Sequence, residues 1–246
     1  MGRRLGQHFL VRGSVLERIA RAACPEPAPR VIEIGPGKGA LTAHLASKAG
    51  EVIAIELDEE LALRLRSRFP DITVISGDVL TTDLAQWGAA VVAGNLPYYI
   101  TSPVIEKVLA LGSLLTRAVF LIQKEVAQRL VAEPGSRDYG YLTVATLIYA
   151  RAEYLFTVPP AAFHPPPKVE SAVVRLTPHP PPVEHPEELL AFVGQCFRQK
   201  RKTIRNNLLP GYGHQVDAWP EAALRAEQLT LEQFAAMHRR LRGVER

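Results

Sequence analysis

Short runs of β-branched and apolar residues alternate with longer amphipathic stretches along most of the chain. Strands that alternate with helical patterns indicate βαβ units, and therefore a parallel sheet covered by helices on both faces. The segment 143–157 predicts a helix followed by a strand, and 169–176 predicts a final strand that pairs antiparallel with it at one edge. The other strands are expected at 30–34, 52–56, 72–75, 91–93 and 118–122, with a helix at 123–130.

The pattern changes after residue 176. Residues 177–186 contain five prolines in ten positions, a composition that predicts a stiff, extended connector. The residues that follow are helical in pattern, with breaks near Pro210 and Thr230. We therefore expect an α/β domain at 1–178 and a small all-helical domain at 187–246, joined by a proline-rich linker at 177–186.

The composition narrows the class of protein. A chain of 246 residues with 47% hydrophobic content can bury a sizeable core. A net charge of +4 and a pI near 9.2 suit a polyanionic partner without requiring one. Cys24 and Cys196 lie far apart, outside any CxxC or His/Cys cluster, so we expect neither a disulfide framework nor a metal site. Because the longest uncharged stretch, 84–105, is interrupted by Gly, Asn and Pro, a soluble cytoplasmic protein without a membrane span is expected.

Polar residues follow three consecutive strands, at the point where each strand ends. The glycine-rich segment 33–39 follows the first strand, Glu56 ends the second at 21 positions after Gly35, and Gly77-Asp78 ends the third. Such strand ends meet at one edge of a parallel sheet, which predicts a nucleoside-binding site there. The GxGxG spacing favours S-adenosylmethionine over a dinucleotide, for which GxGxxG is typical. A nicotinamide-dependent dehydrogenase and a glycine turn without a ligand are the alternatives.

The tetrapeptide Asn95-Leu96-Pro97-Tyr98 follows a fourth strand, and Gly94 is expected to let the backbone turn sharply before it. An amide, carbonyls held rigid by a proline and an aromatic ring are suited to hold a flat base that carries an exocyclic amine. The same residues also describe a proline turn with aromatic side chains in the core.

A basic segment lies at 198–205. The helical period places four of its side chains on one side of a helix, opposite an apolar stripe: Arg198, Arg201, Lys202 and Arg205 against Val193, Phe197, Ile204 and Leu208. No acid occurs between Glu188 and Asp217, so we favour phosphate contacts over an ordinary solvated face. Such contacts position a nucleic acid and do not read its sequence.

Six motifs in one order resemble a known family: 6–10 (GQHFL), 33–39 (EIGPGKG), 95–98 (NLPY), 123–125 (QKE), 163–171 (FHPPPKVES) and 200–206 (KRKTIRN). The chain resembles the bacterial small-subunit (16S) ribosomal RNA adenine N6-dimethyltransferases, the KsgA or RsmA family, over about residues 4–242. The 23S dimethyltransferases that confer macrolide resistance share the first motifs, but the later ones are more similar to the small-subunit enzymes.

The resemblance implies a Rossmann-like class I methyltransferase domain with a mostly parallel seven-stranded sheet, its last strands antiparallel, and a small C-terminal all-helical domain. It implies S-adenosylmethionine as cofactor, 16S rRNA within the 30S subunit or its precursor as partner, and a monomeric enzyme. The residues it places at the cofactor are Gln7, His8, Leu10, Gly35, Gly37, Glu56, Leu57, Asp78, Val79 and Asn95. The family usually has Asn at the position of His8, which leaves that cofactor contact open.

The catalytic residues expected on this basis are Asn95, Leu96, Pro97, Tyr98 and Phe163. The Asn95 side-chain oxygen and the Pro97 carbonyl would accept the two N–H groups of the target adenine. Tyr98 would stack on one face of the base and Phe163 on the other, unless Phe163 is a core aromatic. The residues expected to bind RNA are Arg198, Lys200, Arg201, Lys202 and Arg205.

Three alternatives stay open at this point. The first is a ribosome-assembly or RNA-binding factor with secondary methyltransferase activity, the second is a 23S rRNA dimethyltransferase, and the third is a DNA adenine methyltransferase. The last usually has Asp instead of Asn at the first position of the tetrapeptide.

Overall fold

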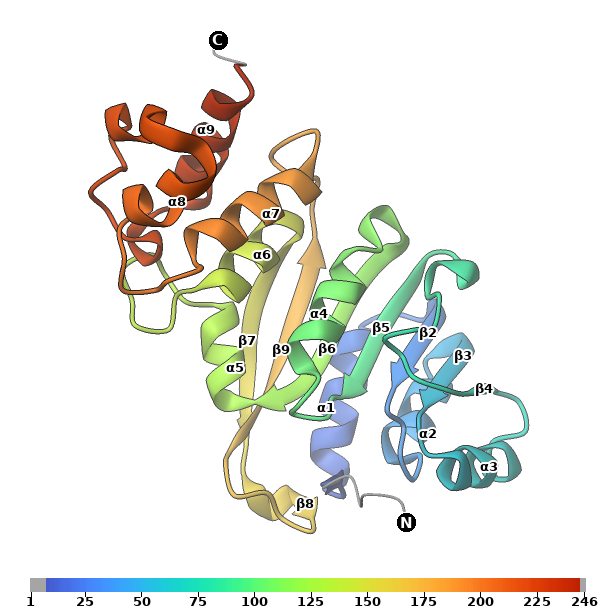
Figure 1. Cartoon of the computed structure of the whole chain (residues 1–246). Coiled ribbons are helices and arrows are strands. Elements are labelled where there is room, and N and C mark those ends of the chain that lie inside the picture. Colours follow the sequence, from blue (N-terminus) through green and yellow to red (C-terminus); the bar gives the residue numbers. More distant parts are fainter. Residues whose placement is uncertain (1–7, 244–246) are drawn as a thin grey trace. The chain divides into compact units, whose positions relative to one another are not determined.

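The computed structural model describes residues 8–243 and separates into two units, which are described in turn (Figure 1). Unit 1 comprises Met1–Ala127 and Ala152–Pro178, and unit 2 comprises Gln128–Arg151 and His179–Arg246. The expectation that 128–151 belongs to the α/β domain is therefore wrong. The physical reason is burial, because Tyr139, Val144 and Ile148 pack into the hydrophobic core of the helical unit.

The sheet of the described chain has seven strands in the order β4-β3-β2-β5-β6-β9-β7. The strands are β2 (Ala28–Ile34), β3 (Ala49–Glu56), β4 (Thr73–Ser76), β5 (Ala90–Asn95), β6 (Leu115–Gln123), β7 (Ala150–Val158) and β9 (Ser171–Pro178). The pairs from β4 to β6 are parallel, whereas β6 and β9 are antiparallel. This confirms the predicted mostly parallel, seven-stranded sheet.

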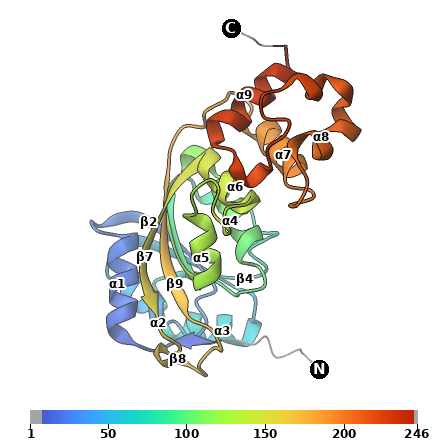
Figure 2. The ribbon, with the colours of Figure 1, turned by 90° about the vertical axis from the view of Figure 1, so that its left-hand side faces the viewer.

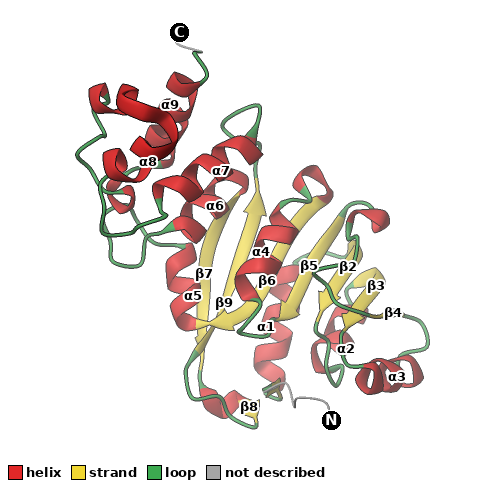
Figure 3. Cartoon of the chain, viewed as in Figure 1, coloured by secondary structure: helices red, strands yellow, loops and turns green. Residues whose placement is uncertain are grey.

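Helices cover both faces of this sheet, as the edge-on view in Figure 2 and the colours of Figure 3 show. They are α1 (Gly13–Ala23), α2 (Ala40–Ala46), α3 (Glu59–Arg68), α4 (Thr101–Leu109) and α5 (Lys124–Leu130). Helix α1 buries Leu16 and Ile19 against alternate residues of the central strands, including Val91 and Val119. Since β5 is buried at five successive positions, its apolar run is that of a strand covered on both sides.

Strand β2 lies between β3 and β5, so the chain order reverses at its carboxyl end and opens a crevice there. Gly94 allows β5 to approach β2 at this point. A Cβ built on Gly94 would lie 2.3 Å from the Ile34 carbonyl oxygen. Gly94 is not among the glycines with positive φ, so its role is close strand packing and the predicted sharp turn is wrong.

A second, two-stranded sheet joins the start of the described chain to the loop between β7 and β9. Strand β1 (Phe9–Leu10) pairs antiparallel with β8 (Phe163–His164), with Phe9 opposite His164 and Leu10 opposite Phe163. Residues far apart in sequence therefore lie side by side at the edge of unit 1 that carries the strand ends.

Unit 2 is helical. Its helices are α6 (Tyr141–Tyr149), α7 (Pro186–Cys196), α8 (Ile204–Tyr212) and α9 (Leu231–Leu241). Thr230 begins α9 with a capping box, accepting from the Gln233 amide at 3.3 Å while its own amide donates to the Gln233 side chain at 2.9 Å. The break expected near Pro210 falls later, because α8 continues to Tyr212 with the proline inside it. Within residues 8–243, no helix has the length and apolarity needed to span a membrane.

Candidate functional site

A cavity of about 390 Å³ lies in unit 1, where the carboxyl ends of β2, β3, β4 and β5 meet. Gln7 lies outside the described residues, and every other residue predicted for the cofactor lines the cavity: His8, Leu10, Gly35, Gly37, Glu56, Leu57, Asp78, Val79 and Asn95. Leu96, Pro97 and Tyr98 line it too. The parallel sheet therefore brings the two predicted groups of residues into one site.

The glycine-rich turn forms one wall of the cavity. Gly35, Gly37 and Gly39 have φ angles of +65°, +57° and +78°, a region in which other residues are strained. A Cβ on Gly37 would also come within 2.9 Å of the Phe9 ring. The Gly37 amide donates to Glu56 Oε2 at 2.9 Å, which ties the turn to the end of β3.

Two carboxylates follow along the same edge. The buried Glu56 accepts from the Gly37 amide through Oε2 and from the Asp58 amide, at 3.0 Å, through Oε1. Asp78 accepts from the Leu80 amide at 2.8 Å. Because a carboxylate offers about four acceptor positions, both residues keep acceptors for hydroxyl or amino groups of a ligand.

Glu33, at the end of β2, is a functional candidate of a different kind. Its side chain is only 1% exposed, and burial raises its pKa to about 8, with a smaller contribution from the neighbouring Glu56. The Thr42 hydroxyl counteracts part of this shift. However, neither that hydroxyl nor Glu33 Oε2 forms a hydrogen bond of normal geometry with a described residue. Glu33 thus lines the cavity with a buried carboxyl group, one oxygen of which lacks a hydrogen-bond partner among the described residues.

The Asn95 amide has one defined orientation. Its Nδ2 donates to the His8 carbonyl oxygen at 3.0 Å. Since a carbonyl only accepts, the nitrogen must face His8, and the Oδ1 atom is left as the acceptor of the side chain. This is the atom that the sequence analysis assigned to the amino group of a base.

The Pro97 carbonyl does not serve as the second acceptor. It already accepts from the Ile100 amide at 3.1 Å and from the Thr101 hydroxyl at 3.1 Å, in the turn that begins α4. Both lone pairs are thereby used, and the assignment of this carbonyl is wrong. Among the described residues none donates to the Leu96 carbonyl, which leaves it as the backbone acceptor next to Asn95.

Tyr98 is held at both ends. Its hydroxyl lies 2.8 Å from Ser171 Oγ, and its ring stacks with His8 at a centroid distance of 6.1 Å and an interplanar angle of 28°. Partial burial raises the pKa of the phenol, against the opposing hydrogen bond from Ser171. Ser171 was not predicted as a site residue, although its position at the start of the last strand, opposite Gln123, places it at the edge of the sheet that carries the site.

Phe163 belongs to the core. It is 4% exposed and packs in the cluster that contains Leu10, Leu16 and Val158. It is paired with Leu10 between β1 and β8 and is not among the residues that line the cavity. That Phe163 stacks on the target base stays a prediction, and its burial favours the alternative of a core aromatic.

The basic segment is not one helix. Helix α7 ends at Cys196 and α8 begins at Ile204, and residues 197–203 form turns between them. The buried Asn207 holds these turns, because its Nδ2 donates to the Cys196 and Gln199 carbonyls at 2.9 and 3.2 Å, and its Oδ1 accepts from the Gln199 amide at 3.0 Å. The helical period could not reveal this break.

The five basic side chains therefore differ in their surroundings. Arg205 forms an ion pair with Asp217 at 2.7 Å, and the pKa of Asp217 is lowered first by a hydrogen bond from His214 and then by Arg205. Lys200 Nζ donates to the Arg137 carbonyl at 3.0 Å. Arg198, Arg201 and Lys202 are exposed and form no ion pair with a described residue. These three are the cations of the segment that remain available to a partner.

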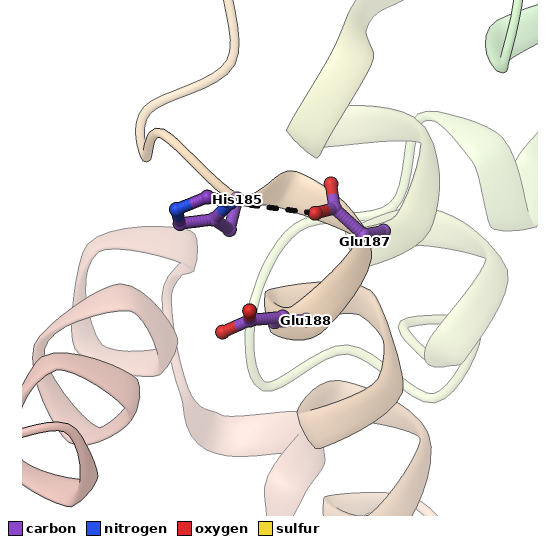
Figure 4. Close-up of side chains that lie close together, drawn as sticks. All are labelled: His185, Glu187 and Glu188. Carbon is purple, nitrogen blue, oxygen red and sulfur yellow. Dashed lines mark ion pairs between the residues drawn. The ribbon is translucent and has the colours of Figure 1, made fainter.

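One trio of potential metal ligands lies at the start of α7 (Figure 4). The ligand atoms of His185, Glu187 and Glu188 lie within 4.8 Å of one another, on the surface. Glu188 Oε2 is, however, 3.0 Å from Arg242 Nη1, and Glu187 lies 3.5 Å from His185 Nδ1. Acids in the first turn also complement the helix dipole, so these residues form an ion-pair network that stabilises a helix end.

Comparisons with known proteins cover nearly the whole chain. The profile of the family described as ribosomal RNA adenine dimethylase matches residues 2–242. The ribosomal RNA small subunit methyltransferase A of Acidobacterium capsulatum is 45% identical over 255 aligned residues, which span 97% of this chain and 90% of that protein. The crystal structure of a dimethyladenosine transferase from Plasmodium falciparum matches with a TM-score of 0.81 and 26% identity, covering 96% of this chain and 98% of that one. The 23S rRNA methyltransferase ErmE matches with a TM-score of 0.75 and 30% identity, covering 95% and 99%.

The seven-stranded sheet and the cavity at its switch point define a Rossmann-like methyltransferase that uses S-adenosylmethionine. The ordered acceptors at Glu56 and Asp78 fit the hydroxyl and amino groups of a nucleoside. The chain belongs to the ribosomal RNA adenine dimethylase family.

Proposed function

We propose that this enzyme transfers two methyl groups to N6 of adenines in a hairpin of small-subunit (16S) rRNA. The observation that carries the proposal is that one cavity is lined both by Gly35, Gly37 and Glu56 and by the tetrapeptide from Asn95 to Tyr98. The proposal includes a monomeric enzyme that acts in the cytoplasm on the 30S subunit or its precursor, in line with relatives named for the small subunit.

S-adenosylmethionine supplies a methyl group made electrophilic by a positively charged sulfur. Glu56 would hold the ribose hydroxyls, and Asp78 and Val79 would hold the adenine, the latter through its backbone. The unpartnered Oε2 of Glu33 supports this fit, because the ammonium group of an amino-acid tail supplies the hydrogen bond that this oxygen lacks. Apolar Leu57, half exposed at the rim, would cover the purine.

The target adenine would be held by Asn95 Oδ1 and the Leu96 carbonyl, one for each N–H of its amino group. The lone pair of N6 is delocalised into the ring, so positioning is the main requirement, and near-attack alignment supplies roughly 7–11 kcal/mol. No strong base is needed, because the nitrogen becomes acidic once alkylated and releases its proton to water. After the first transfer one N–H remains, and one of the two acceptors is enough to orient it.

Tyr98 would stack on the target base, which contributes about 1–3 kcal/mol. The base must first leave its own stack, so the substrate is a loop or a flipped nucleotide. In unit 2, Arg198, Arg201 and Lys202 would contact RNA phosphates, while Lys200 and Arg205 would contribute less because they already bond to Arg137 and Asp217.

The test is methyl transfer to defined substrates. The enzyme is incubated with labelled S-adenosylmethionine and, in separate reactions, under-methylated 30S subunits, protein-free 16S rRNA, 23S rRNA and duplex DNA. Mass spectrometry of the nucleosides should find N6,N6-dimethyladenosine in the 30S reaction. Transfer confined to 23S rRNA or DNA, or binding to 30S subunits without transfer, would overturn the proposal. Light scattering after size exclusion checks the monomeric state.

A further inference from the structure

His8 joins three parts of the site through three different groups. Its carbonyl accepts from Asn95 Nδ2 at 3.0 Å, its Nδ1 lies 2.8 Å from the Pro165 carbonyl oxygen, and its ring stacks with Tyr98. The resemblance to the family predicted a cofactor contact at this position. The side chain of His8 instead contacts Pro165, which does not line the cavity, and Tyr98, which would hold the base.

The bond to Pro165 fixes the imidazole. The β1–β8 register pairs residue 9 with 164 and 10 with 163, so His8 is the next position of the ladder, opposite Pro165. Proline has no N–H to donate across the ladder, and its carbonyl is instead taken by the His8 ring. Because that carbonyl can only accept, Nδ1 carries the proton, which sets both the tautomer and the plane of the ring.

The orientation of the His8 ring also affects the orientation of the Tyr98 ring. A tyrosine side chain turns about two bonds, and Ser171 fixes only the position of the hydroxyl, at 2.8 Å. The His8 ring, inclined by 28° at a centroid distance of 6.1 Å, restricts rotation of the Tyr98 ring about its own axis. Ser171 is fully buried, so both supports of Tyr98 are themselves held by the surrounding structure.

We propose that His8 is a positioning residue for methyl transfer: anchored on Pro165, its ring sets the plane of Tyr98 against which the target base stacks. This inference rests on the proposed function, since it needs a base at Tyr98. It separates this position from the cofactor, whose binding then depends on the neighbouring glycine turn and carboxylates.

The chain offers two complementary variants. His8→Asn keeps an N–H donor near the position of Nδ1, and thus the anchor on Pro165, but removes the ring. His8→Phe keeps a ring but removes the donor. Single-turnover methyl transfer at saturating cofactor should fall about 10-fold for His8→Asn, within the range for loss of an aromatic pair, and about 3-fold for His8→Phe, within the range for loss of one hydrogen bond. The Kd for S-adenosylmethionine, measured by calorimetry, should stay within about 2-fold of the wild-type value in both variants.

A double-mutant cycle separates positioning from general stability. In a Tyr98→Leu background, His8→Asn should change the transfer rate less than about 2-fold, because the ring that it positions is gone. The inference is overturned by an undiminished rate in His8→Asn, by a weaker cofactor Kd with an unchanged rate at saturation, or by an equal loss in both backgrounds. Absence of transfer by the wild-type enzyme would instead refute the proposed function, so the two failures are distinguishable.

Discussion

The cavity in unit 1 and the basic turns of unit 2 hold their functional groups in opposite ways. At the cavity, Asn95 and Glu56 are fixed by hydrogen bonds to the backbone of neighbouring segments. In residues 197–203 the fixed group is Asn207, which lies underneath, while Arg201 and Lys202 extend from exposed turns. The cavity fixes the positions of individual acceptor atoms, whereas the turns fix only where a group of positive charges lies on the surface.

The difference follows from what each region would do. Methyl transfer requires reacting atoms at near-contact distance and in line, so a displacement of about 1 Å is costly. Phosphate contacts are long-range and tolerant of direction, and flexible cations on a supported turn are sufficient. Substitutions in the cavity should therefore change rate steeply, whereas those in the turns should change affinity gradually.

The largest effect is expected at Asn95. Asn95→Ala removes the oriented acceptor, and transfer at saturating substrates should fall about 10²- to 10³-fold, as for loss of a preorganised polar group. Asn206→Ala is the matched control, because this asparagine is exposed in α8 and should leave the rate unchanged. A rate for Asn95→Ala within about 10-fold of wild type would remove the distinction between the regions.

The sequence predicted the positions of the site residues better than the contacts of their individual atoms. Parallel strands must bring their carboxyl ends to one edge, so the positions of Gly35, Glu56 and Asp78 could be predicted from strand order alone. The partners of individual atoms could not. Whether the Pro97 carbonyl is free depends on the first turn of α4, and the burial of Phe163 depends on its packing against residues of distant segments such as Leu10 and Leu16.

In unit 2 the helical period correctly predicted the apolar stripe but not the break between α7 and α8. Both helices pack into the same hydrophobic core, so the apolar spacing shows no interruption where the helix ends. Ile204 and Leu208 are buried as expected. The break depends on one buried amide, Asn207, which bonds to the backbone of Cys196, Gln199 and Lys202, all within 11 residues of it.

The second prediction concerns pH and tests whether burial at the cavity edge has an energetic cost. The pKa of Glu33 rises from 4.5 in the unfolded chain to about 8 in the folded one. The folded state therefore binds this proton more tightly, and the contribution of Glu33 to the free energy of unfolding is most favourable below pH 4.5 and falls as pH rises towards 8.

Glu33→Gln should abolish this fall. Between pH 5 and 8 the wild type should lose on the order of 2–3 kcal/mol relative to the variant, at up to 1.36 kcal/mol per pH unit. Urea unfolding at the two pH values measures the difference. Glu59→Gln, at an exposed position of α3, is the control and should retain the wild-type difference. If the free energy of unfolding changes equally with pH in Glu33→Gln and wild type, Glu33 does not have the raised pKa that its burial implies.

The third prediction removes the support of the basic turns. Asn207→Ala leaves the Gln199 amide and the Cys196 carbonyl without their partner, and unsatisfied buried groups cost about 2 kcal/mol in unfolding free energy. Hydrogen exchange should increase in residues 197–203. The neighbouring Asn206→Ala provides the comparison, and equal stability of the two variants would show that the amide does not hold the turns.

The smallest effect is expected for single cations of the turns. Arg201→Gln should weaken RNA binding only a few-fold and lower the slope of log K against log salt concentration by about 1, because one phosphate contact is lost. Arg205→Gln should change the slope less, since Arg205 is already neutralised by Asp217 at 2.7 Å. Filter binding of a 16S rRNA fragment at several salt concentrations measures both slopes. A larger change for Arg205→Gln than for Arg201→Gln would mean that RNA displaces Asp217. The ion pair would then be part of the binding surface, and charge in unit 2 would be positioned as specifically as the acceptors of the cavity.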